Sequence, residues 1–145
     1  GRAALQARDY KRAVKMAQEE QKRNPNLTES YLLSAEAYAK MNNFNLCARE
    51  YQKAIELAEQ PAIIYVQLAS CYRRSGNLDV AEKMLNHAAS KESGLADIYR
   101  ELGQIFEMKG SYNQAIESYS QYLALDPSAP DAAQVKREIK KIESY

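Results

Sequence analysis

Apolar residues recur three and four positions apart over most of the chain, with polar residues between them. Tyr31, Ala35 and Tyr38 show this spacing, which is typical of one face of an amphipathic α-helix. The pattern also returns every 34 residues, and the residues in register are Tyr31, Tyr65 and Tyr99; Ala35, Ala69 and Gly103; Tyr38, Tyr72 and Phe106; Phe44, Leu78 and Tyr112; and Tyr51, Leu85 and Tyr119. The chain is therefore predicted to be a helical repeat protein.

The turns between the helices follow the same period. Each predicted first helix ends on a residue that tolerates the left-handed conformation, namely Asn42, Gly76 or Gly110. Each is followed by a residue that favours a helix N-cap, namely Asn43, Asn77 or Ser111. Ser111 with Gln114 also has the spacing of a capping box. Each unit is therefore predicted to be a helix, a tight turn and a second helix.

The register extends to both ends of the chain. Asp9 is a candidate N-cap in phase with Asn43, which predicts a partial unit over residues 1–25 with a helix over 9–24. Three full units are predicted over residues 28–61, 62–95 and 96–129. Ser128 and Pro130 favour the start of a closing helix over 130–145, whose apolar stripe is Val135, Ile139 and Ile142.

These residues resemble the tetratricopeptide repeat family. Its pattern is most complete in the last unit, at Tyr99, Leu102, Gly103, Phe106, Ala115, Tyr119 and Pro127. Departures from it are Ser34 for Leu, Cys47 for Ala, Leu85 for the aromatic residue and Ser93 for Pro. The resemblance implies an all-α fold, a right-handed α-solenoid of antiparallel helix pairs, and a concave groove that binds an extended peptide or a partner helix.

The resemblance also implies which residues line the groove. They lie off the packing stripe of each first helix: Leu32, Leu33, Glu36, Lys40, Ile63, Val66, Gln67, Ser70, Arg73, Arg74, Arg100 and Gln104. Leu32, Leu33, Ile63 and Val66 are expected to form an apolar floor, and the basic residues a patch that suits a partner with apolar anchors and acidic residues. The alternative is that the arginines pair with acids of this chain. Leu32, Glu36, Asp97 and Glu101 stand where the family's clamp for acidic peptide tails would need basic residues or Asn.

The composition does not point to a particular chemical activity. The chain has 145 residues, a net charge of +1 and 27% charged residues. We find no arrangement typical of a catalytic centre, a metal site or a cofactor site, and we expect the single histidine, His87, to be a surface residue. Cys47 and Cys71 are expected to be buried thiols, which favours a reducing compartment such as the cytoplasm, although the periplasm stays open.

Three functions are therefore considered. The first is a non-enzymatic interaction module or scaffold of a larger, bacterial-type assembly, because the closing unit with Asp126 and Pro127 is similar to many bacterial members. The second is self-association through the apolar surface around Val14 of the helix over 9–24. The third is a nucleic-acid-binding repeat, which the acidic groove residues Glu29, Glu36, Asp97, Glu101 and Glu107 argue against.

Overall fold

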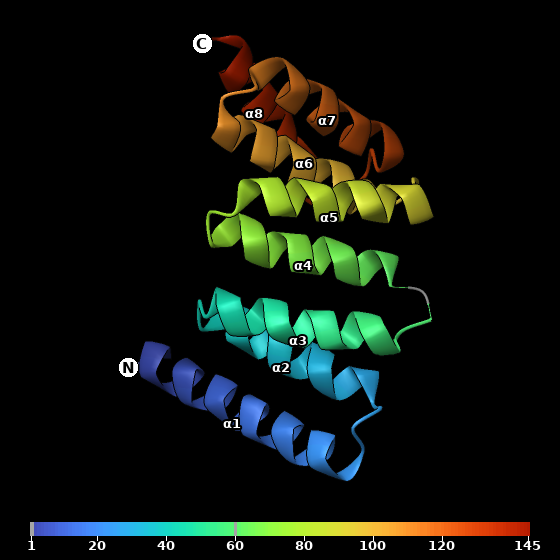
Figure 1. The fold of residues 1–145 in the computed structure, drawn as a ribbon. Coiled ribbons are helices and arrows are strands. Elements are labelled where there is room, and N and C mark those ends of the chain that lie inside the picture. Colours follow the sequence, from blue (N-terminus) through green and yellow to red (C-terminus); the bar gives the residue numbers. More distant parts are fainter. Residues whose placement is uncertain (1, 60) are drawn as a thin grey trace.

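The computed structural model describes residues 2–59 and 61–145, with side chains from Gln6 onward. Within these residues the chain forms eight α-helices and no strand, stacked in one direction from the N-terminus to the C-terminus (Figure 1). The helices are α1 Arg2–Arg23, α2 Thr28–Lys40, α3 Phe44–Leu57, α4 Ala62–Arg74, α5 Leu78–Lys91, α6 Ala96–Lys109, α7 Tyr112–Leu125 and α8 Ala132–Glu143. The prediction of an all-α repeat solenoid is confirmed.

The tight turns inside the helix pairs α2/α3, α4/α5 and α6/α7 have the predicted backbone. Asn42, Gly76 and Gly110 adopt φ values of 61°, 89° and 79°. The residue after each turn donates its amide back to the preceding helix, for example Ser111 N–H to Phe106 O at 2.8 Å. The left-handed residue and this backbone bond together close each first helix.

The predicted side-chain caps are only partly present. The Asn43 side chain accepts a hydrogen bond from Leu46 N at 3.4 Å. Asn77 and Ser111 make no such bond, so the capping box of Ser111 with Gln114 is wrong. The closing backbone bonds fix these turns without help from the side chains.

The predicted helix start at Asp9 is also wrong, because α1 runs unbroken from Arg2 to Arg23. Arg8 stands in the register position of Asn42 and Gly76, and it lacks their tolerance for the left-handed conformation. The closing helix begins at Ala132 rather than Pro130, with Val135 and Ile142 buried as predicted. Tyr122 is buried against this helix.

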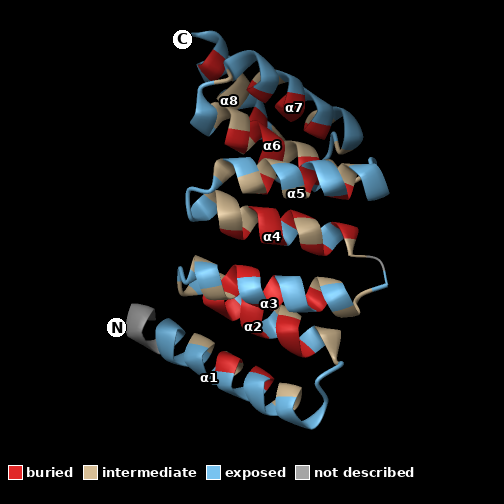
Figure 2. Ribbon diagram, viewed as in Figure 1, coloured by how far each residue is buried: buried red, intermediate tan, exposed pale blue. Residues whose placement is uncertain are grey.

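Small residues let neighbouring helices approach closely. Gly103 of α6 is the clearest case, because a Cβ atom there would lie 2.5 Å from Cε1 of Tyr119 on α7. The buried residues form stripes on the facing sides of the helices, whereas α1 is mostly exposed (Figure 2). Each helix therefore packs mainly against its neighbours in the stack, as in a repeat solenoid.

Cys47 of α3 and Cys71 of α4 are joined by a disulfide, with their Cα atoms 6.2 Å apart. Both residues are buried, as expected, but they are not free thiols. Disulfides are typical of oxidising compartments, so these cysteines no longer support a reducing one. The cross-link ties the first full helix pair to the second.

Candidate functional site: the groove face of α2, α4 and α6

The predicted groove residues differ widely in exposure. Val66 is buried, and Leu32, Ser70, Arg73, Arg100 and Gln104 are half-buried. Leu33, Glu36, Lys40, Ile63, Gln67 and Arg74 are exposed. The apolar surface on this face is therefore limited to Leu33 and Ile63, which are 44% and 52% exposed, and the half-buried Leu32.

Three of the four basic groove residues, all of them arginines, make contacts within the chain. Arg73 Nε lies 2.7 Å from Glu101 Oε2, and Arg100 Nη1 lies 3.4 Å from Asp131 Oδ2. Arg74 donates to the Asn42 side chain at 3.2 Å, with its guanidinium 4.6 Å from the centre of the Phe44 ring. Of the two alternatives that the sequence left open, the structure therefore shows internal pairing for Arg73 and Arg100.

At the N-terminal end of the groove face, Leu33 lies between two shallow hollows. One has a volume of about 330 Å³ and is lined by α1 and the start of α2, including Met16, Ala17 and Leu27. The other has a volume of about 320 Å³ and is lined by Tyr10, Ala13 and Ala37, with charged residues at its edges. Leu33 lines both hollows, so this end presents an apolar side chain flanked by space.

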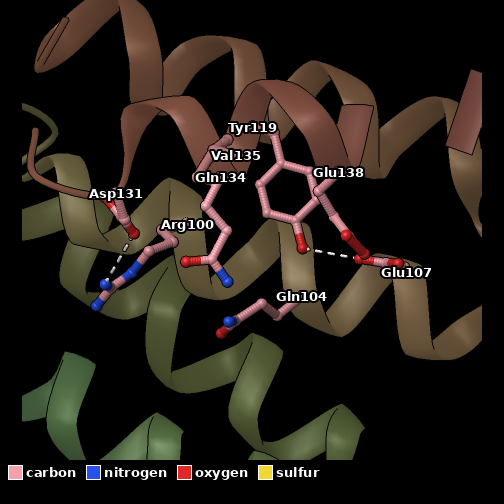
Figure 3. Close-up of a pocket in the computed structure, with 8 residues that line it drawn as sticks. All are labelled: Arg100, Gln104, Glu107, Tyr119, Asp131, Gln134, Val135 and Glu138. Carbon is pink, nitrogen blue, oxygen red and sulfur yellow. Dashed lines mark hydrogen bonds and ion pairs between the residues drawn. The ribbon is translucent and has the colours of Figure 1, made fainter. Parts of the chain in front are cut away.

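At the C-terminal end lies a polar cavity of about 380 Å³ between α6, α7 and α8. It is lined by Arg100, Gln104, Glu107, Tyr119, Asp131, Gln134, Val135 and Glu138, whose side chains converge in Figure 3. Gln104 lies two repeat periods after Glu36, which lines a hollow beside Leu33. The cavity and that hollow are therefore on the same face of the solenoid.

Two carboxyl groups meet at one side of this cavity. Burial and a hydrogen bond with Glu138 raise the pKa of Glu107 above its ordinary value. The same hydrogen bond lowers the pKa of Glu138. Tyr119 Oη donates to Glu107 Oε1 at 2.9 Å, and burial together with this carboxylate raises the pKa of Tyr119 (Figure 3).

The opposite side of the cavity holds a paired acid and two unpaired atoms. Asp131 accepts hydrogen bonds from Tyr122 Oη and from Arg100, and these bonds lower its pKa. Burial and Asp131 raise the pKa of Tyr122 to about 12. Arg100 Nε and Gln104 Oε1 are buried and have no hydrogen-bond partner among the described residues.

The sequence analysis placed Arg100 and Gln104 on the groove but missed the cavity, because it assigned no groove residue to the closing helix, which is α8. The signal lies in the repeat register. Glu107 occupies the place of Arg73 one period later, and Val135 that of Glu101. The ion pair between α4 and α6 is therefore not repeated at the same register positions between α6 and α8.

The described residues also bear on metal binding, on membrane spans and on the single histidine. No cluster of three or more His, Cys, Asp or Glu residues suited to a metal ion occurs there. None of the described helices is long and apolar enough to cross a membrane. His87 is exposed on α5, as predicted, with its ring 4.5 Å from that of Tyr65.

Comparison with known families identifies the repeat. Two tetratricopeptide repeat profiles match residues 28–61 and 60–128. The chain belongs to the tetratricopeptide repeat family. Members of this family generally serve as interaction modules without catalysis, and this supports an interaction module here.

Curated relatives are much longer proteins with different names. Human protein O-mannosyl-transferase TMTC1 is 28% identical over 121 residues, which cover 83% of this chain and 13% of the relative. Lipopolysaccharide assembly protein B of Escherichia coli K12 is 30% identical over 89 residues, which cover 53% of this chain and 23% of the relative. The chain thus spans less than a quarter of either protein.

Solved structures share the fold at low sequence identity. MamA is 22% identical with a TM-score of 0.76, over 92% of this chain and 82% of that chain. The first TPR domain of Spaghetti (RPAP3), solved with a bound Hsp90 peptide, is 20% identical with a TM-score of 0.72, over 81% of this chain and 90% of that chain. The similarity establishes the solenoid architecture.

Proposed function

We propose that this chain is a non-enzymatic docking module whose groove face binds a segment of another protein, as part of a larger protein or assembly. The observation that carries the proposal is Leu33, a large apolar side chain that is 44% exposed on a first helix and lies between two hollows. An exposed apolar residue beside open space suits an apolar anchor of a bound segment. The peptide bound to the RPAP3 domain supports this use of the fold.

The ion pairs change the partner chemistry expected from the sequence. A partner with apolar anchors and acidic residues was expected because four basic residues were assigned to the groove, but Arg73 and Arg100 already contact Glu101 and Asp131. Near Leu33, the exposed charges include Glu29 and Glu36 as well as Lys40. The proposed partner segment is therefore apolar at its anchor and has no need of an acidic run.

The test is partner capture from an extract of the source organism, with Leu33→Asp as the altered bait. Leu125→Asp is the matched control, because Leu125 is 40% exposed at the end of α7, outside the groove positions. We expect Leu33→Asp to reduce capture of the specific partner at least about tenfold, and Leu125→Asp to leave it unchanged. Equal capture by all three baits would contradict binding at the groove.

Self-association is a second candidate, favoured by the exposure of Met16. Met16 is 65% exposed, whereas Glu50, its register counterpart one period later, is 2% exposed. Val14, around which the sequence placed the self-association surface, is buried, so Met16 is the residue to test. Light scattering should show a dimer that Met16→Glu dissociates and Met108→Glu does not, since Met108 is similarly exposed at 56% on α6. A monomer at all concentrations excludes this candidate.

A further inference from the structure

The cavity between α6 and α8 exists because the interaction that closes the preceding junction is absent from it. Between α4 and α6, the Arg73 guanidinium contacts the Glu101 carboxylate, and both side chains are largely buried. One period later the same places hold Glu107 and Val135, so a carboxyl group replaces the cation and an aliphatic group replaces its partner. The Glu107 carboxyl group therefore lines the cavity at the position where Arg73 closes the preceding junction.

The charges around the cavity do not balance on the side of Glu107. Asp131 is neutralised by Arg100 and accepts a further bond from Tyr122. Glu107 and Glu138 share one cation, Lys141, whose Nζ lies 4.0 Å from Glu107 and 3.2 Å from Glu138. Lys141 is 57% exposed, so it lies at the rim and compensates the pair only in part. The cavity therefore offers carboxylate oxygens to a second cation.

Two further polar atoms determine which ligand the cavity can bind. Gln104 Oε1 is a buried acceptor without a donor, and Arg100 Nε is a buried donor without an acceptor. Leaving such groups unpaired is costly, so a ligand gains affinity if the partly exposed Arg100 and Gln104 side chains turn toward it and pair both atoms. The required ligand has several N–H donors that face Glu107, Glu138 and Gln104, and one acceptor that faces Arg100.

We propose that this cavity binds a lysine or arginine side chain of the protein segment that lies along the groove. The ammonium or guanidinium group takes the place of the hydrogen bond between Glu107 and Glu138, so that it donates to both carboxylates and to Gln104 Oε1. A backbone carbonyl of the same segment accepts from Arg100 Nε–H. This inference rests on the proposed function, since it assigns one side chain of the segment that the groove binds.

The geometry favours this occupant over a metal ion or a free amine. A volume of about 380 Å³ falls within the range of organic ligand sites and exceeds the needs of a single ion. A metal ion supplies no acceptor for the unpaired Arg100 Nε–H. A free diamine would leave Arg100 Nε unpaired, whereas a peptide supplies the carbonyl acceptor.

The test is a titration of isotopically labelled protein with Nα-acetyl-arginine N-methylamide, its lysine analogue and its glutamine analogue, followed by nuclear magnetic resonance. We expect the side-chain amide signals of Gln104 and Gln134 to shift in a saturable way, with a Kd on the order of 1 mM for probes of this size. The glutamine probe should bind at least about tenfold more weakly, because it has no charge for the two carboxylates. n-Butylguanidine, which has the guanidinium and the same single charge but no carbonyl, should bind more weakly than the arginine probe.

The variant Glu107→Gln/Glu138→Gln keeps the shape of both side chains and removes the charge. It should weaken binding of the arginine probe at least about tenfold. Glu143→Gln is the matched control on α8, because Glu143 is exposed and does not line this cavity, and it should leave the Kd unchanged. Melting curves establish that the variants remain folded.

Several results would overturn the inference. These are no saturable shift with either basic probe, equal binding of the glutamine probe, n-butylguanidine binding as tightly as the arginine probe, or Mg²⁺ or Ca²⁺ saturating the site instead. If Leu33→Asp abolishes partner capture while the basic probes do not bind, the proposed function stands and only this assignment falls. If the probes bind at the cavity but no partner depends on Leu33, the cavity is a basic-group site and the proposed anchor is wrong.

Discussion

Two successive junctions of the solenoid use the same repeat positions in opposite ways. Between α4 and α6, the Arg73 guanidinium and the Glu101 carboxylate form a short ion pair, so each charge has a partner. Between α6 and α8, Glu107 and Val135 stand in those places, and a cavity of about 380 Å³ remains. A repeat can therefore keep its helices in register while two of its positions lose a structural contact and leave a cavity, which we propose as a site for a ligand.

The strongest test of the structural junction is Arg73→Ala. It leaves the Glu101 carboxylate, whose side chain is 7% exposed, without its cation, and we expect the free energy of unfolding to fall by about 3 kcal/mol. Chemical denaturation measures the change. The double variant Arg73→Leu/Glu101→Leu should regain most of it, because replacing both partners removes the uncompensated charge. A loss below about 0.5 kcal/mol for Arg73→Ala would show that the pair is not a structural contact.

The second prediction concerns the disulfide between Cys47 of α3 and Cys71 of α4, which precedes both of these junctions along the chain. These residues are separated by 24 positions, so reduction should lower the free energy of unfolding by about 3 kcal/mol through the loop that the disulfide closes. Denaturation with and without a reductant measures it, and Cys47→Ala/Cys71→Ala should no longer respond to the reductant. Hydrogen exchange in α6–α8 of the native protein should stay nearly unchanged, because each unit contacts mainly its neighbours. Coincident denaturation curves would contradict this role.

The third prediction concerns the packing that positions Glu107. Gly103→Ala places a Cβ atom against the Tyr119 ring, so we expect a loss of roughly 1–3 kcal/mol and a displaced Tyr119–Glu107 hydrogen bond. Gly94→Ala is the control, because no atom lies within 4 Å of a Cβ atom at that position. Thermal denaturation compares the two. If Gly103→Ala is as stable as Gly94→Ala, the close approach of α6 and α7 does not require glycine at position 103.

The smallest effect is the pH dependence at Glu107. Because its pKa is raised in the folded protein, its ionisation destabilises the fold as the pH rises from the unfolded value near 4.5 through the raised folded value. Tyr119, Glu138 and Lys141 face this group and are all present in Glu107→Gln. We therefore expect Glu107→Gln to gain stability relative to the unaltered protein across that window, by less than about 1 kcal/mol. A difference in stability that does not vary with pH would contradict the raised pKa.

The sequence predicted the parts of this structure that follow from the repeat. The helix pairs, the left-handed residues Asn42, Gly76 and Gly110, and the buried stripe of the closing helix all follow from periodicity and local backbone preferences. The unbroken α1 and the disulfide were missed, because a register match does not show whether a helix stops or whether two buried cysteines meet.

The candidate site was less predictable for a physical reason. Which arginines are free depends on distances between different helices, as with Arg73 and Glu101, and these distances do not follow from spacing within one helix. The cavity depends in addition on α8, whose residues differ from those of the full units. Only a comparison of Arg73 with Glu107 across the register could have indicated it.

The most direct measurement is selection from a library of random displayed peptides on the unaltered protein and on Glu107→Arg/Val135→Glu, which copies the α4–α6 ion pair into the α6–α8 junction. The account predicts that the unaltered protein enriches peptides with an apolar residue and a separate lysine or arginine. The altered protein should keep the apolar preference and lose the basic one. Enrichment of acidic residues by the unaltered protein, or the same basic preference in both proteins, would contradict the account.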